Sequence, residues 1–79
     1  MKYEINQIVY FIGSRRGEIV IEAMRIDKIE INRKFNAIYY SGEYIDDPES
    51  IPHCEYEELL FSCREDAIAE IQRQLEALN

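Results

Sequence analysis

Long hydrophobic runs, glycine and proline are scarce in this chain, and each scarcity excludes a class of protein. No apolar run approaches the roughly 18–20 residues that a membrane-spanning helix needs, and the opening MKYEINQ lacks the basic start and apolar core of a signal peptide. Only three glycines and two prolines occur in 79 residues, and 47% of residues are hydrophobic, which argues against disorder. We therefore expect one small folded domain over residues 1–79, located in the cytoplasm.

Cysteine and histidine are also few, which argues against disulfide and metal scaffolds. The two cysteines, Cys54 and Cys63, fall short of the about four that a disulfide-stabilised domain of this size would carry. His53 is adjacent to Cys54, so the two side chains would point to opposite faces of a strand. We expect two reduced thiols, no metal site and no cofactor.

Catalytic signatures are missing as well. A serine or cysteine nucleophile needs a base beside it in space, and the single histidine is a sequence neighbour of Cys54 instead. The glycine-flanked segment Gly13–Gly17 lacks the Lys-Ser/Thr pair and the following helix of a phosphate-binding loop. The sequence therefore predicts a protein that is not an enzyme, with no catalytic residues.

Hydrophobic residues alternate before residue 62, which predicts strands joined by turns. In the second of these segments the apolar positions change phase twice, so we expect two bulges or a sharp bend there. Turns are expected at Gly13–Gly17 and at 32–34, and Ser41-Gly42 is expected to end the third strand. The expected strands are 8–12, 18–31, 35–40, a short one at 43–45, and about 55–60.

The last segment, about 63–78, has the periodicity of a helix. Ser62 and Glu65 have the spacing of a capping box, in which each side chain binds a free backbone N–H. An apolar stripe, which we expect to pack on the sheet, is formed by Ile68, Ile71, Leu75 and Leu78. The predicted fold is α+β: a small bent antiparallel sheet, or SH3-like partly open barrel of four to five strands, followed by one C-terminal amphipathic helix.

Two segments of the chain resemble a known group of proteins. Ile8–Ile12 followed by a hairpin, and the later Glu58-Leu59-Leu60-Phe61-Ser62-x-x-Glu65-x-Ala67, are similar to small SH3-like β-barrel proteins of bacteria and their phages. The resemblance implies that the chain near Phe61 closes the barrel and that a C-terminal helix follows. Asp66 stands where a second glutamate is usual. The resemblance carries over no functional residue.

Charge is divided unevenly along the chain. Residues 1–40 carry seven bases against five acids, whereas residues 41–79 carry two bases against eleven acids, which gives the total of −7. Such asymmetry points to partners and solubility more than to fold.

The basic residues of the first half offer one functional hypothesis, a nucleic-acid-binding barrel that acts through its turns. Two observations disfavour direct binding: the overall charge is −7, and the two basic turns flank one long strand, which would place them at opposite ends of the sheet. The residues of this alternative are Arg15, Arg16, Arg33 and Lys34.

The acidic half offers the hypothesis that we prefer, a protein-binding module. Tyrosines interleaved with carboxylates combine rigid aromatic anchors with steering charge, which suits a protein partner with a basic surface. The predicted binding residues are Tyr40, Glu43, Tyr44, Asp46, Asp47, Glu49, Glu55, Tyr56 and Glu57. By analogy of size and charge, the sharpest version is a phage anti-CRISPR-like inhibitor that blocks a nucleic-acid-binding groove in the host cytoplasm. A short sheet has exposed edges, so both a monomer and an edge-strand homodimer stay open.

Overall fold

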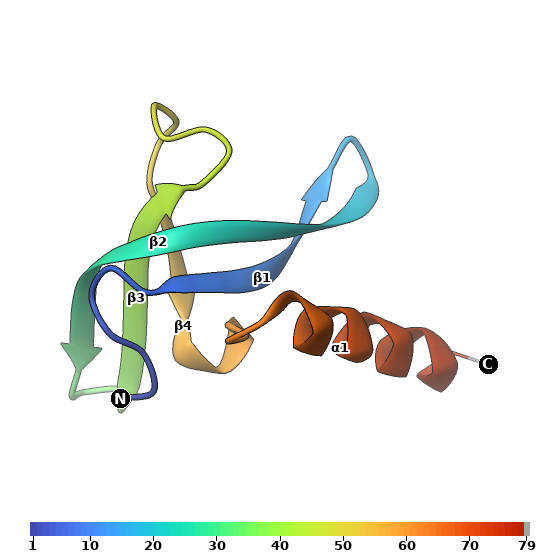
Figure 1. Cartoon of the computed structure of the whole chain (residues 1–79). Helices are drawn as coiled ribbons and strands as arrows, with labels where there is room; N and C mark the ends of the chain where they lie inside the picture. Colours follow the sequence, from blue (N-terminus) through green and yellow to red (C-terminus); the bar gives the residue numbers. More distant parts are fainter. Residues whose placement is uncertain (79) are drawn as a thin grey trace.

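One antiparallel sheet, curled into a half-barrel, forms most of the molecule (Figure 1). The computed structural model describes residues 1–78. Its strands lie in the order β1-β2-β3-β4, and a single C-terminal helix follows, which confirms the predicted fold class. The elements are β1 (Ile8–Arg15), β2 (Glu18–Asn32), β3 (Ala37–Tyr44), β4 (His53–Tyr56), the short 3-10 turn η1 (Glu57–Leu59) and α1 (Arg64–Ala77).

The hairpin between β1 and β2 is tighter than the sequence suggested. Arg15 pairs with Glu18, so only Arg16 and Gly17 form the loop, and both have positive φ, 52° and 80°. Two residues of positive φ define the turn whose twist matches that of the flanking strands. Gly13 was expected in the turn, but it belongs to β1.

The long strand β2 contains one irregularity instead of two. Its pairing with β3 shifts between Ile26 and Lys28, which moves the apolar pattern from even to odd positions. The earlier phase change involves no bulge, because the pairing of β1 with β2 is continuous. There Ile21 lies on the opposite face from the buried Met24, so both faces of this part of β2 carry apolar side chains.

Gly42 lets the backbones of β2 and β3 approach each other beside this irregularity. A Cβ atom placed on Gly42 would lie 2.1 Å from the carbonyl oxygen of Arg25. The strand therefore continues through Ser41-Gly42 to Tyr44, where the sequence suggested a break and a separate strand at 43–45. Gly42 therefore does not end the strand; it lies within β3, where only a residue without a Cβ allows the two backbones to come this close.

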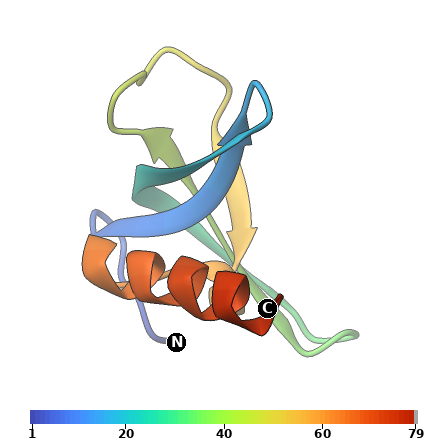
Figure 2. The same cartoon turned by 90° about the vertical axis from the view of Figure 1, so that its right-hand side faces the viewer.

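The inner face of the curled sheet holds the hydrophobic core. The side chains of Val9, Met24, Ile26 and Tyr40 are completely buried. Tyr3, Phe11 and Leu60 complete the cluster, so the segments before β1 and after η1 cover one opening of the half-barrel (Figure 2).

A short backbone contact attaches the segment after η1 to β1. Tyr10 and Phe61 exchange two hydrogen bonds, with N···O distances of 2.9 and 2.8 Å. This pair extends the curl of the sheet from the outer edge of β1 to the start of the helical segment. The expectation that the chain near Phe61 closes the barrel is met at this one point.

The helix packs on the sheet through its first half only. Ala67 is fully buried and Ile71 is half-buried, but Leu75 is 51% and Leu78 82% exposed, so the expected stripe is only partly covered. The residue before the first turn is Cys63, and no side chain caps the helix, so the capping box expected at Ser62 is not formed. No helix within residues 1–78 has the length and apolar character required to cross a bilayer.

Replacing Gly42 by alanine tests the close approach of β2 and β3. We expect Gly42→Ala to lower the free energy of unfolding by about 3 kcal/mol, the upper end of the usual cost of overpacking, because the new methyl group meets backbone. Gly13→Ala is the matched control, since its Cβ would meet side chains and no backbone: the movable Glu22 at 3.3 Å and Val20 at an ordinary contact distance of 3.8 Å. Urea denaturation of both variants measures the difference, and equal stabilities would contradict this account.

Candidate functional site

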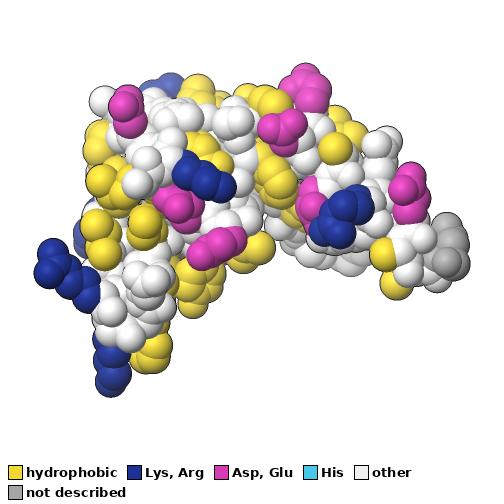
Figure 3. Space-filling model, turned by 90° about the horizontal axis from the view of Figure 1, so that it is seen from below, with side chains coloured by type: hydrophobic (Ala, Val, Ile, Leu, Met, Phe, Trp, Pro, Cys, Tyr) yellow, Lys and Arg dark blue, Asp and Glu magenta, His cyan; other side chains and the backbone are white. Residues whose placement is uncertain are grey.

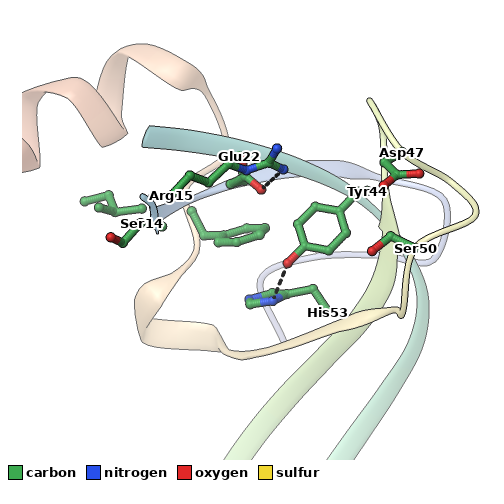
Figure 4. A pocket seen from close by; sticks show the side chains of 10 residues that line it. Ser14, Arg15, Glu22, Tyr44, Asp47, Ser50 and His53 are labelled. Carbon is green, nitrogen blue, oxygen red and sulfur yellow. Dashed lines mark hydrogen bonds and ion pairs between the residues drawn. The ribbon is translucent and has the colours of Figure 1, made fainter. Parts of the chain in front are cut away.

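An open hollow of about 310 Å³ lies between the end of β1, the end of β3 and the start of β4 (Figure 4). The loop between β3 and β4 contributes two of its polar walls, Asp47 and Ser50. The other residues that line the hollow are Phe11, Ile12, Gly13, Ser14, Arg15, Glu22, Tyr44 and His53.

Aromatic rings form the floor of the hollow. The ring of His53 is stacked on that of Phe11, with centroids 4.0 Å apart and planes 2° from parallel. Tyr44 lies against both, 6.0 Å from Phe11 and 5.7 Å from His53. Phe11 belongs to the buried core, so the floor is anchored from beneath and presents a rigid aromatic surface.

A chain of hydrogen bonds holds His53 in place. The Tyr44 hydroxyl lies 3.1 Å from Nδ1 of His53, and Nε2 lies 3.0 Å from the Glu55 carboxylate. In the neutral ring, Nε2–H donates to Glu55 and Nδ1 accepts from Tyr44, so both ring nitrogens are satisfied. The imidazole is thereby fixed as part of the aromatic floor.

An ion pair forms the opposite wall of the hollow. The guanidinium of Arg15 donates to Glu22 at 2.7 Å, and this hydrogen bond together with the carboxylate charge raises the pKa of Arg15. The absence of a side chain at Gly13 leaves room for Glu22. Because Arg15 is already bound to an acid, its charge is compensated within the chain.

The structure divides the predicted binding residues among three places. Tyr44, Asp47 and Glu55 meet at the hollow or its hydrogen-bond chain, and Asp46 and Glu49 lie exposed on the loop beside Asp47. On the outer face of the sheet, Glu43 pairs across from Arg25, and the rings of Tyr56 and Tyr39 lie 4.7 Å apart.

The remaining two predicted residues, Tyr40 and Glu57, lie at the edge of the core, where Tyr40 is buried and Glu57 is half-buried. Tyr40 is fully buried, so the outward-facing member of the adjacent pair is the half-buried Tyr39, and Tyr40 does not lie on the surface where a partner-binding residue was expected. Alternation along a strand requires one of the two to face inward, but it does not say which.

Tyr40 and Glu57 form a network that links the N-terminal segment to the sheet. The Tyr40 hydroxyl donates to Glu57 at 2.6 Å, and the backbone N–H groups of Lys2 and Tyr3 donate to Glu57 and to Tyr40. The hydrogen bond from Tyr40, and after it that from the backbone of Lys2, lower the pKa of Glu57. Burial raises the pKa of Tyr40.

The two basic turns occupy opposite ends of the sheet, as the sequence predicts. Arg15 and Arg16 lie at the β1–β2 hairpin, while Arg33 and Lys34 lie in the turn between β2 and β3, at the far end of β2 (Figure 1). Seen from below, basic and acidic side chains are dispersed among hydrophobic ones and form no single patch (Figure 3).

A second recess, of about 370 Å³, lies on the helix side of the same β1 edge. Ile12 lines both recesses, so the two adjoin at β1, and Glu55 lines the second. The rest of the second recess is formed by η1, by α1 and by the segment between them, through Glu58, Leu59, Phe61, Glu70, Arg73 and Gln74. Arg73 is held by Glu70.

Sequence reasoning missed the centre of the site, which is His53 with Phe11 beneath it and Glu22 opposite. One local signal was present: His53 and Glu55 are two residues apart, so on a strand they share a face and can bond. The contact of His53 with Phe11 joins β4 to β1, which are not neighbours in the sheet, and no local pattern indicates it.

Comparison with known proteins gives no relative: no family model, curated protein or solved structure matches this chain. Among residues 1–78, no group of three or more His, Cys, Asp or Glu side chains is arranged to hold a metal ion.

The network around Glu57 predicts a component of acid sensitivity. Because its pKa is lowered on folding, Glu57 stabilises the native state near neutral pH, and this contribution is lost as the pH falls through its pKa in the folded protein. We expect Glu57→Gln to flatten the fall in unfolding free energy between pH 6 and pH 3, measured by urea titration. Tyr40→Phe should lower the free energy of unfolding by about 1–2 kcal/mol at pH 7, because it removes the hydroxyl from a partly buried network.

Glu58→Gln is the control for this titration, because Glu58 is exposed beside Glu57 and takes no part in the Tyr40 network. An acid limb that changes as much in Glu58→Gln as in Glu57→Gln would contradict the assignment.

Proposed function

We propose that this chain is a non-enzymatic protein-binding module that receives a basic segment of its partner at the hollow between β1, Tyr44 and β4. The observation that supports this most directly is the combination of a fixed aromatic floor with carboxylates around it. Phe11, His53 and Tyr44 form the floor, Asp47 lines the hollow, and Glu55 is hydrogen-bonded to His53.

The chemistry of this arrangement favours a lysine or arginine side chain as the entering group. Cationic groups are attracted to the faces of aromatic rings and to carboxylates, and both attractions strengthen where water is partly excluded. The overall charge of −7 adds a long-range component that speeds encounter with a basic partner. Pre-formed rings lose little conformational entropy on binding.

The sharper form of the proposal concerns what the partner does. On an SH3-like scaffold of phage origin acting in the host cytoplasm, the acids of the β3–β4 loop would stand in for phosphates and block a basic nucleic-acid groove. The support is the clustering of Asp46, Asp47 and Glu49 on one exposed loop, together with the small size and acidity of the chain. The alternative, nucleic-acid binding by the basic turns, has less support because those turns are at opposite ends of the sheet.

Neutralising the loop acids tests the proposed function. We expect the variant Asp46→Asn, Asp47→Asn, Glu49→Gln to recover about tenfold less of a basic protein partner from a bacterial lysate, measured by quantitative mass spectrometry after affinity capture. The three residues are exposed, so the thermal midpoint should stay nearly unchanged.

A variant with the same net charge provides the control: Glu4→Gln, Asp27→Asn, Glu76→Gln changes three exposed acids away from the hollow. It should retain capture. Equal loss in both variants would show that only total charge matters, and unchanged capture by the loop variant would refute the proposed site. Retention of the wild type on heparin that weakens in Arg15→Ala, Arg16→Ala would favour the nucleic-acid alternative.

A further inference from the structure

The outer edge of β1 is only partly occupied. Tyr10 directs its N–H and C=O away from β2 and toward Phe61. In an antiparallel strand, alternate residues direct their backbone groups to the same side, so Ile12 and Ser14 also face outward. Within residues 1–78 no strand pairs with them on that side, because the only bridge outside the sheet is that between Tyr10 and Phe61.

The chain begins a fifth strand beside β1 but does not continue it. Read backward from Phe61, it passes Leu60 and then enters the 3-10 turn η1 (Glu57–Leu59), which leads toward β4. The position of a neighbouring strand beside Ile12 and Ser14 is therefore not occupied by any segment of residues 1–78. Exposed strand edges of this kind are templates for pairing with another segment.

A strand added on this line would project its side chains alternately into the two recesses described above. Those on the inner side would enter the hollow over Phe11 and His53, where Asp47 offers a carboxylate. Those on the other side would enter the second recess, where Leu59 and Phe61 offer apolar contacts beside the carboxylates of Glu58 and Glu70. An alternation of basic and apolar residues matches this pair of environments.

The charges along the β1 edge indicate whether the segment that binds there is basic or acidic. The residues lining the two recesses include two bases against five acids, a net formal charge of −3. Both bases are bound within the chain, Arg15 to Glu22 and Arg73 to Glu70. A second copy of this chain would bring another −7 to the same edge, which opposes homodimer formation here.

We propose that an extended segment of the partner, with basic and apolar residues in alternation, adds to the outer edge of β1 at Ile12–Ser14 as a fifth strand and completes the half-barrel. This inference rests on the proposed function, since it specifies how the basic segment is held. It adds backbone pairing to the side-chain contacts in the hollow.

An acetylated, amidated and fluorescein-labelled octapeptide of alternating Lys and Val is the probe, with binding measured by fluorescence anisotropy. Its counterpart carries N-methyl groups on alternate residues, which removes the N–H donors of one edge and retains the side chains. We expect the N-methylated peptide to bind about tenfold or more weakly, since backbone hydrogen bonds to the edge are lost. Equal binding of the two peptides would overturn strand addition.

Variants of Ser14 test the same edge from the side of the protein. Ser14→Pro removes an outward N–H at an edge position where β2 pairing does not use it, and Ser14→Ala keeps that N–H. We expect a loss of about tenfold or more for Ser14→Pro and little change for Ser14→Ala. If Ser14→Pro fails to fold, the comparison of the two peptides decides alone.

The same assay separates this inference from the proposed function. Weaker binding to the Asp46→Asn, Asp47→Asn, Glu49→Gln variant, combined with no effect of N-methylation, would retain the proposed function and overturn strand addition. No binding of either peptide would overturn both. A wild-type dimer in sedimentation that Ser14→Pro converts to monomer would assign the edge to a second copy and overturn the proposal.

Discussion

The pair of hydrogen bonds between Tyr10 and Phe61 is the constraint on which the remaining architecture depends. It joins the outer edge of β1 to the chain after β4, segments that the sheet itself does not bring together. With this contact in place, Leu60 enters the core beside Tyr3, and α1 begins against β1. The inner face of the four-stranded sheet is thereby covered further without a fifth full strand. This arrangement suits a chain that is too short to build a thick core.

The same contact explains why the candidate site lies where it does. Closure at one residue pair brings β4 close enough to β1 for His53 to stack on Phe11, yet it leaves the rest of the β1 edge open. The hollow is therefore a by-product of incomplete closure, and its floor is continuous with the core. On the other side of the core, the buried Tyr40 places its hydroxyl against the half-buried Glu57 carboxylate, so the one polar atom of this ring is hydrogen-bonded at the edge of the core.

The sequence predicted the parts of this molecule that depend on local pattern. Strand alternation, the position of the helix and the separation of the basic turns follow from residues close together in the chain, and the fold class was right. Contacts between distant segments were not predictable: Tyr40 faces inward, although Tyr39 fits the local pattern equally well. His53 gained its role only through Phe11, and the stripe ending at Leu78 extends past the sheet that was expected to cover it.

Gly42 has a consequence for how the chain reaches this fold. Sliding β3 by two residues along β2 would retain the alternation of faces, but it would place Tyr40 or Tyr44 beside the carbonyl of Arg25. Neither side chain fits where even a methyl group collides. A slipped pairing would have to give up this close approach of the two backbones, so the small residue at position 42 favours the native register over its two-residue neighbours.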